Sequence, residues 1–352
     1  MKKVSISLSQ IAKEAGVSCG LVSSLFSNNT YRNGGGIGIA PETEDRIIRA
    51  SRKLGYIPKD LAMRLKIYPD FGCFGFLISN MSRSGFAPFY SELMFGAYDN
   101  INSTEVNFSI GSFDGNCDFL NEPQKMPFCT TDNHTSKFMF AGSVNYSLLL
   151  ALKKRGSSIV YFLREVDIEG VTSIVPDFEN AGYLGVKHLL EHGHREIAVA
   201  AEHYFKELSY CTTYILKGIK HALEEAGLPF ENDEVAYNNS TDPAASDCFG
   251  QLQSRGKKYT AIFCLCDYTA LRVMNSISSA GLRVPEDISI VGCNNQSFSV
   301  NLNPPLTSID LNLREIGKCG AEILNTPERK HKSLYEFPVR LVERKSVINL
   351  NK

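Results

Sequence analysis

SLSQIAKEAGVSCGLVSSLFSNN, residues 7–29, decides how the N-terminal part of this 352-residue chain folds. Ser7 and Gln10 form an S-x-x-Q capping box that can start a helix. Gly16 ends that helix, because glycine takes the left-handed conformation at little steric cost. Ser18 then caps a second helix. Two short helices joined by a tight glycine-containing turn predict a helix-turn-helix unit.

A third helix and a positive charge complete this N-terminal unit. The helix begins at Pro41, a favoured first-turn residue, and stops at Gly55. Residues 1–68 hold eleven Lys and Arg residues against five acids, a net charge of +6. The whole chain has a net charge of −1, so the remainder carries −7. A basic head on an acidic body suits binding to a polyanion such as nucleic acid. A chance cluster on a solvated face is the alternative.

Residues 7–29 and the run APETEDRIIRASRKLGYIP, residues 40–58, together resemble the headpiece of the LacI/GalR transcriptional repressors. The resemblance assigns DNA contacts to Ser7, Ser18, Cys19, Gly20, Ser23, Ser24, Asn28, Arg32, Arg64 and Leu65. The reading face departs from the family, because Cys19, Gly20 and Ser24 cannot make the bidentate guanine contact of an arginine. That contact discriminates between bases by about 1–3 kcal/mol. Either the headpiece reads an unusual operator, or it binds DNA weakly.

Residues 59–70 resemble the hinge of the same family. There the hinge folds into a short helix on operator DNA, and a leucine from each subunit enters the minor groove. Leu65 stands at the matching place, with Arg64 and Lys66 beside it for phosphates. Apolar wedges of this kind kink the duplex. A plain linker helix is the alternative.

From residue 71 onward, short apolar strands alternate with amphipathic helices, as in 74–79 followed by 89–101. Such alternation implies parallel sheets built of β-α-β units. The phrases PFYSELMFGAYD (88–99) and GLRVPEDISIVGCNN (281–295) resemble the effector domain of the family. The predicted fold class is therefore α/β: an all-α helix-turn-helix headpiece followed by a periplasmic-binding-protein-like domain with two doubly wound parallel sheets.

The predicted boundaries follow from this organisation. They are a DNA-binding headpiece at 1–58, a hinge at 59–70, and an effector-binding and dimerisation domain at 71–352. Within the last, the N-lobe is expected at 71–163 and 296–325, and the C-lobe at 164–295 and 326–352. Ligands of such sheets bind at the carboxyl ends of the strands, in the crevice between the lobes.

The resemblance also places the effector site. The candidate residues are Phe89, Tyr90, Asp177, Ile215, Cys266, Asp267, Asn294 and Gln296. Ile215 replaces an arginine that often holds a sugar, and Leu163 replaces an aspartate. A sugar or related metabolite is the expected effector, but the loss of these anchors argues against the usual binding mode. A less polar ligand and the loss of small-molecule control both remain open.

Other functional classes find little support in the residues. No apolar run approaches the roughly 18 residues of a membrane span, and the N-terminus lacks the apolar region of a secretory signal. The ten cysteines show no metal-binding spacing. His188 and His192 could share one helical face, but Gly193 turns His194 elsewhere, so no metal is predicted. No arrangement of acids, Ser and His defines a nucleophile and its base.

We therefore expect a cytoplasmic transcription regulator, a repressor rather than an enzyme, without a cofactor. Its expected partners are pseudo-palindromic double-stranded operator DNA, a small-molecule effector and a second copy of the chain. A ligand-binding module with a degenerate headpiece is the main alternative. An enzyme on the same fold and a DNA-binding protein without a ligand are further alternatives.

Overall fold

The computed structural model describes a large part of the chain, which divides into two compact units. The described residues are 6–26, 39–56, 58, 67, 73–79, 88–101, 107–131, 135–202, 209–230, 235–238, 247–326 and 331–351. One unit contains residues 1–75, 103–109 and 128–137, and the other contains the rest.

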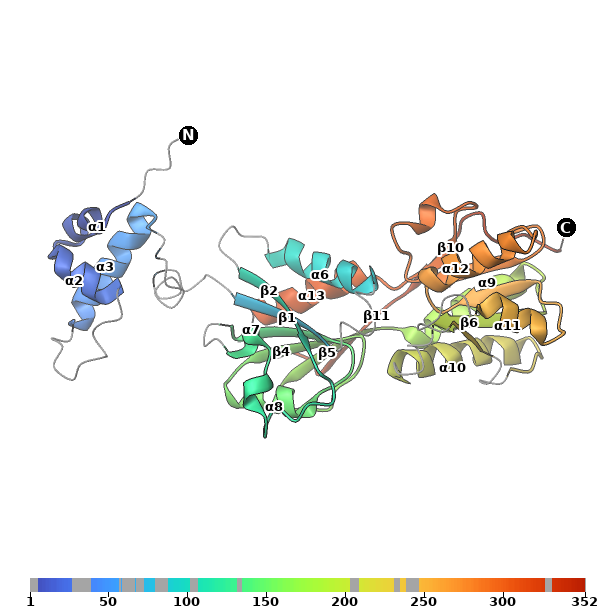
Figure 1. Ribbon diagram of the computed structural model, residues 1–352, viewed down its shortest axis with the longest axis horizontal. Coiled ribbons are helices and arrows are strands. Elements are labelled where there is room, and N and C mark those ends of the chain that lie inside the picture. Colours follow the sequence, from blue (N-terminus) through green and yellow to red (C-terminus); the bar gives the residue numbers. More distant parts are fainter. Residues whose placement is uncertain are drawn as a thin grey trace. The chain divides into compact units, whose positions relative to one another are not determined.

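The N-terminal helices are α1 (Leu8–Ala15), α2 (Cys19–Phe26) and α3 (Pro41–Leu54) (Figure 1). The predicted capping box is present: the Ser7 main-chain N–H donates to Gln10 Oε1 at 2.7 Å, and Ser7 Oγ accepts from the Gln10 N–H. Gly16 and Gly55 end α1 and α3 with φ values of 63° and 70°, in the left-handed region. The structure confirms the helix-turn-helix that the sequence predicts.

The three helices enclose a small apolar core. Ile11, Val22 and Ile47 are fully buried in it, and Ile67, from the expected hinge, is buried with them. Arg46 on α3 donates hydrogen bonds to the carbonyl oxygens of Ala15 (2.6 Å) and Gly16 (2.9 Å). A guanidinium therefore binds the last carbonyls of α1, where the partial charge of a helix is negative.

The described residues that follow contain two six-stranded sheets. The first has the order β11-β5-β4-β3-β1-β2, and the second has the order β12-β10-β9-β8-β6-β7. The strands of the first are β1 (Cys73–Ser79), β2 (Asn107–Phe113), β3 (Lys137–Ala141), β4 (Ser158–Phe162), β5 (Val171–Pro176) and β11 (Leu334–Phe337). Those of the second are β6 (Ile197–Glu202), β7 (Ala236–Asn238), β8 (Ala261–Cys264), β9 (Ser289–Cys293), β10 (Thr307–Asp310) and β12 (Arg340–Val342).

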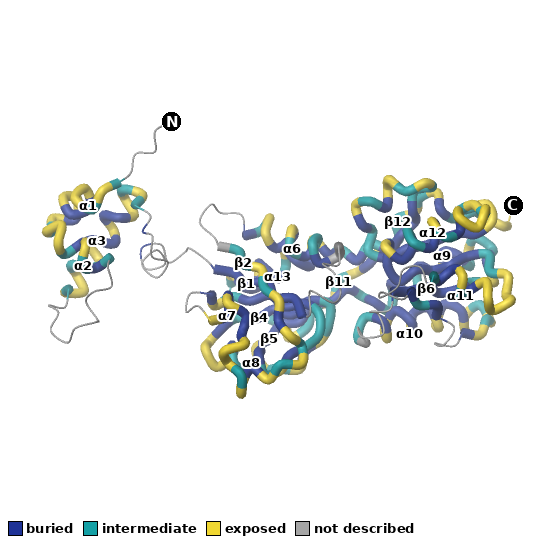
Figure 2. Tube along the Cα trace, viewed as in Figure 1, coloured by how far each residue is buried: buried dark blue, intermediate teal, exposed yellow. Residues whose placement is uncertain are grey.

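Most strand pairs are parallel, and their middle strands are buried, as the dark blue tube in Figure 2 shows. β12 alone among the second sheet's described pairings runs antiparallel, against β10. Runs such as AIFC in β8 and SIVGC in β9 are buried at every position. Strands buried on both faces are typical of a doubly wound sheet covered by helices.

Helices cover both sheets. With the first sheet belong α6 (Pro88–Ile101), the short α7 (Phe128–Thr131), α8 (Tyr146–Lys154) and α13 (Leu313–Asn325), together with the 3₁₀ turn η2 (Pro123–Lys125). With the second belong α9 (Phe178–Glu191), α10 (Ser209–Glu225), α11 (Cys248–Ser254), α12 (Asp267–Ser279) and the 3₁₀ turn η5 (Ser299–Asn301). α6 packs along α13, and α9 packs along α10 (Figure 1). None of the helices in the described part of the chain is long and apolar enough to cross a membrane.

The chain passes between the two sheets at three places within these elements: from β5 to α9, from β10 to α13, and from β11 to β12. The lobe boundaries expected from the sequence do not coincide with these three crossings. β5 belongs to the first sheet although the N-lobe was expected to end at 163, and β10 belongs to the second sheet although it lies within 296–325. β11 pairs with β5 although residues 326–352 were assigned to the C-lobe. Strand partners are set by long-range pairing, so local sequence patterns do not reveal them.

Candidate functional site

A cavity lies at the carboxyl ends of strands from both sheets, as the strand order of doubly wound folds predicts. It contains about 590 Å³ of empty space, part of it open to solvent. Its lining residues are Tyr90, Gly142, Leu163, Arg164, Phe178, Tyr210, Cys211, Ile215, Leu265, Asn294, Leu311 and Leu313. Gly142, Leu163 and Asn294 each follow directly on a strand. The two sheets thus both contribute to the wall of one cavity.

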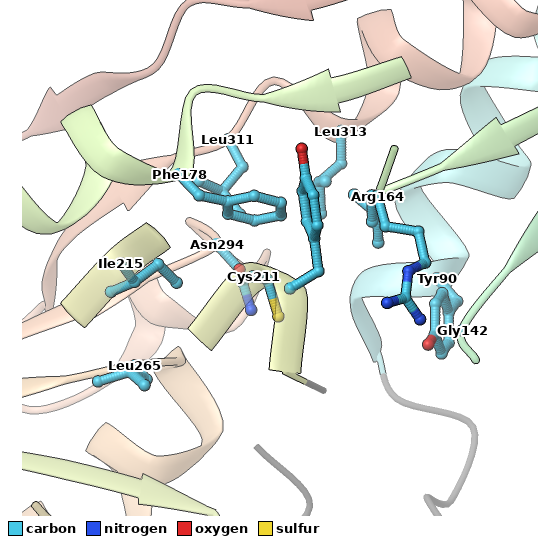
Figure 3. A pocket seen from close by; sticks show the side chains of 12 residues that line it. Tyr90, Gly142, Arg164, Phe178, Cys211, Ile215, Leu265, Asn294, Leu311 and Leu313 are labelled. Carbon is cyan, nitrogen blue, oxygen red and sulfur yellow. The ribbon is translucent and has the colours of Figure 1, made fainter. Parts of the chain in front are cut away.

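Most of the cavity wall is apolar. Phe178, Ile215 and Leu265 come from the second lobe, and Leu311 and Leu313 lie where the chain crosses from β10 to α13 (Figure 3). Cys211 adds a thiol whose pKa is raised to about 11, chiefly by burial. This thiol is therefore neutral near pH 7. An apolar wall is consistent with the prediction that the polar side chains that often hold a sugar are absent from this chain.

Arg164 is the one charged side chain among the described residues that line the cavity. It is the second residue after β4, and its guanidinium extends into the cavity (Figure 3). Its Nε atom is buried and has no hydrogen-bond partner within the described part of the chain. Arg164 is not among the residues that the sequence predicts for the site, although its place just after a buried strand, at the carboxyl edge of the sheet, is a usable signal.

Two residues at the cavity have unusual backbones. Leu163 has φ 69° and Asn294 has φ 99°, both outside the regions that most side chains adopt. For a leucine this conformation costs about 1–2 kcal/mol, whereas asparagine tolerates it better. The Asn294 main-chain N–H donates to the Ile309 carbonyl at 2.8 Å, which fixes it beside β10. Strained residues of this kind gather at functional sites.

Three of the predicted effector residues line the cavity: Tyr90, Ile215 and Asn294. Tyr90 is buried, and burial raises the pKa of its hydroxyl, so the group is a neutral phenol. The side chain of Phe89 lies outside the described residues.

Asp267, Cys266 and Gln296 are not among the lining residues, contrary to expectation. The Asp267 carboxylate accepts hydrogen bonds from the Gln296 main-chain N–H (2.6 Å) and from the hydroxyls of Ser299 and Ser308 (2.5 Å each). Cys266 Sγ caps α12 by accepting from the Thr269 N–H. These hydrogen bonds connect the start of α12 to the loops beside it. The polar groups of Asp267 and Cys266 therefore stabilise the fold instead of facing the cavity.

Asp177 lies at the crossing from β5 to α9, and it too is absent from the cavity wall. Its carboxylate caps α9 by accepting from the Asn180 N–H at 2.9 Å, and its main-chain N–H donates to the Phe337 carbonyl. It borders a neighbouring hollow that Glu165 and Glu336 also line. Its contacts therefore connect two of the crossing segments.

The predicted DNA-reading face divides into three groups. Cys19, Gly20 and Ser23 are exposed on α2, and Ser24 is half-buried. Ser7 and Ser18 cap α1 and α2 through their hydroxyls, since the Leu21 N–H donates to Ser18 Oγ at 3.3 Å. The other four candidates lie outside the described residues: Asn28, Arg32, Arg64 and Leu65.

One group of side chains within the described residues could hold a metal ion: His188, His192 and Glu343, whose ligand atoms lie within 4.8 Å of one another. The Nε2 atom of His188 is buried without a partner in the described chain, and burial lowers the pKa of this ring. His194 is used otherwise, by Thr260 and the Ile348 carbonyl. The prediction that the protein holds no metal stays a prediction.

Comparisons with known proteins agree with this architecture. Residues 186–347 match the model of the periplasmic binding protein-like domain. The HTH-type transcriptional repressor PurR of Aliivibrio salmonicida (strain LFI1238) is 28% identical over 347 residues, which covers 97% of this chain and 99% of that protein. The catabolite control protein A of Priestia megaterium is 25% identical over 97% of this chain and 99% of its own length.

A solved structure described as the lac repressor dimer bound to operator and the anti-inducer ONPF superposes with a TM-score of 0.67 at 22% identity. It covers 98% of this chain and 99% of its own. The chain is similar in sequence to these repressors over nearly its whole length, and it shares the fold of the lac repressor. Its described residues contain both a helix-turn-helix and two largely parallel sheets.

The chain departs from the LacI/GalR pattern that its sequence resembles at the exposed face of α2 and at the cavity. The exposed positions at the start of α2 are Cys19 and Gly20, and the α2 sequence CGLVSSLF contains no basic residue. The cavity is apolar apart from a few groups and holds an arginine after β4.

Proposed function

We propose that this protein is a DNA-binding transcriptional repressor whose affinity for its operator is set by a small molecule bound in the cavity. The observation that carries the proposal is the combination of a capped helix-turn-helix with a cavity at the carboxyl ends of two parallel sheets. The helix-turn-helix corresponds to the proposed DNA binding, and the cavity corresponds to the proposed binding of a small molecule. The PurR relative named above is an HTH-type transcriptional repressor, which supports the same conclusion and argues against an enzyme.

The crossing segments supply the coupling in this proposal. Asn312 Nδ2 donates to the Pro338 carbonyl at 2.6 Å, and Arg340 binds the Asp310 carboxylate at 2.9 Å. With the bond from Asp177 to Phe337, these contacts join the three segments between the lobes. A ligand that contacts both lobes stabilises the arrangement of the lobes in which it makes the better contacts. By linkage, ligand and DNA then alter each other's affinity by the same factor.

The proposed active form is a homodimer in the cytoplasm. Two headpieces bind successive major grooves of a pseudo-palindromic operator. The headpiece charge of +6 over residues 1–68 supports attraction to DNA. No cofactor is required, because binding and release of the ligand are the whole cycle.

A ligand-binding module with a degenerate headpiece is the second candidate. The exposed Cys19, Gly20 and Ser23 favour it, because none offers the fork of donors with which arginine reads guanine. This candidate predicts that the protein binds a ligand but prefers no DNA sequence.

Selection of bound duplexes from a random DNA pool by the full-length protein, at two salt concentrations, separates the two candidates. A repressor enriches a palindromic site, and its half-sites show which bases α2 selects. Recovery of only sequence-independent, strongly salt-sensitive binding would favour the degenerate headpiece. The pool is selected with and without cell metabolite extract, because a corepressor is required for operator binding in one of the two possible regulatory schemes.

A further inference from the structure

The charge of Arg164 has no counterion in the part of the chain that the structure describes. No ion pair includes it there, and none of the described residues lining the cavity is acidic. The carboxylate of Asp267 is fully buried and is occupied by three hydrogen bonds. A guanidinium stays ionised in proteins, so the cavity presents a fixed positive charge to its ligand.

A partly buried charge is stable only when it is paired and hydrogen-bonded. The Nε of Arg164 is already removed from water without a partner in the described chain. A carboxylate is the ligand group that matches it best, because its two oxygens accept two parallel N–H bonds from one guanidinium. A phosphate dianion would leave excess charge beside a single arginine.

The rest of the wall defines the body of the ligand. Phe178, Ile215 and Leu265 offer apolar surface, and Leu311 and Leu313 extend it (Figure 3). A polyol would lose hydrogen bonds to water here without replacing them, and each unpaired buried group is costly. The ligand body is therefore an aromatic ring or a branched hydrocarbon. Asn294, held by the Ile309 carbonyl, offers a second polar contact.

We propose that the effector is a small organic acid with an apolar body, whose carboxylate binds Arg164. This inference rests on the proposed function of the cavity as the effector site. It replaces the sugar expected from the family resemblance, and it makes Arg164 the residue that determines ligand specificity. The arginine lost at position 215 is thus compensated by a cation that enters the cavity from the other lobe.

The test compares ligands of one shape and different charge. Benzoate and benzamide are nearly isosteric, and so are phenylacetate and phenylacetamide. Isothermal titration of the full-length protein at pH 7 should show that the carboxylates bind roughly tenfold to a hundredfold more tightly than the amides, since hydrogen bonds between charged groups are about that much stronger. Ribose and cellobiose are the polyol controls, and neither should bind measurably.

Two variants assign the effect to Arg164. Arg164→Met should reduce carboxylate affinity to that of the amide, and Arg164→Lys should retain part of it, because lysine keeps the charge but loses the bidentate geometry. Arg283→Met removes the same charge from an exposed surface site and should bind the carboxylates normally. Thermal unfolding of each variant checks that it is folded.

The inference is overturned if amides and carboxylates bind equally, if no carboxylate binds, or if Arg164→Met binds them as the wild type does. The proposed function is measured separately, by operator binding of the same samples. A protein that selects a palindromic site but ignores the carboxylates refutes the inference alone. One that binds the carboxylates through Arg164 and selects no site refutes the repressor function and leaves the ligand class intact.

Discussion

At the scale of single residues, Asp267 shows how the same side chain can suggest one role in sequence and have another in structure. It is fully buried at the first turn of α12, and three donors bind its carboxylate. Burial nevertheless raises its pKa to about 6, because loss of water outweighs the stabilising hydrogen bonds and the nearby charge of Arg344. The residue joins α12 to the loop after β9.

Asp267 should make the stability of the protein depend on pH between about 4 and 6. The folded state holds the proton more tightly than the unfolded chain, whose carboxyl titrates near 3.8. Its favourable contribution is therefore complete below pH 3.8 and is lost as the pH rises through about 6. The loss is on the order of 3 kcal/mol, at 1.36 kcal/mol per pKa unit. Urea unfolding across this range measures it.

Asp267→Asn is the matching variant, and its stability should lack this loss on raising the pH. Asp287→Asn, an exposed carboxylate, is the control and should keep the wild-type profile. A profile of Asp267→Asn that parallels the wild type would show that other groups cause the pH dependence.

At the scale of secondary-structure elements, the same packing device occurs in both lobes. On α6 and α13, a Cβ built on Gly96 would lie 1.9 Å from the Arg314 carbonyl oxygen, and one on Gly317 would lie 2.0 Å from that of Leu93. On α9 and α10, a Cβ on Gly218 would lie 1.8 Å from the Glu179 carbonyl oxygen. Backbones this close leave no room for a side chain. The helix pairs therefore require glycine at their crossing points.

Gly96→Ala and Gly218→Ala should each destabilise the protein by about 1–3 kcal/mol or more, because the added methyl must displace main-chain atoms. Gly250→Ala in α11 is the control. It is exposed, its added Cβ would meet its nearest neighbour at 4.0 Å, and alanine should stabilise the helix by about 0.5–1 kcal/mol. Thermal unfolding of the three variants measures these changes in stability. Equal changes at all three positions would contradict the requirement for glycine at the helix crossings.

At the scale of the whole molecule, α6 is the surface on which we expect two copies to meet. Phe95 and Tyr98 on this helix are 49% and 54% exposed. Adjacent exposed aromatic side chains often mark an interface. The opposite flank of α6 packs on α13, so the exposed aromatics are not needed by the core of the lobe.

The double variant Phe95→Lys/Tyr98→Lys should be monomeric by light scattering, whereas the wild type should be a dimer. Its affinity for a palindromic operator should fall at least tenfold, because the two headpieces no longer bind as one unit. Tyr146→Lys changes an aromatic residue on α8 that is 55% exposed, and this control should remain dimeric. A wild type that is monomeric, or a double variant that stays dimeric, would place the interface elsewhere.

The sequence alone determined the local features of this protein. The capping box at Ser7 and the glycine stops at Gly16 and Gly55 were predicted because each depends on residues only a few positions apart. The alternation of strands and helices predicted two parallel sheets for the same reason. It also predicted a ligand site at the carboxyl ends of the strands, where three of the candidate residues, Tyr90, Ile215 and Asn294, line a cavity.

Only the tertiary structure decided which strands share a sheet and which polar groups face the cavity. β5 and β11 pair although about 160 residues separate them in the sequence, and no local pattern records such a pairing. Asp267 was expected at the ligand, but its donors come from Ser299 and Ser308, more than thirty positions away. Arg164 lines the cavity because the ends of strands from both sheets come together around that space. Burial and hydrogen-bond partners are properties of the folded chain, so the chemistry of the site was settled only when distant segments met.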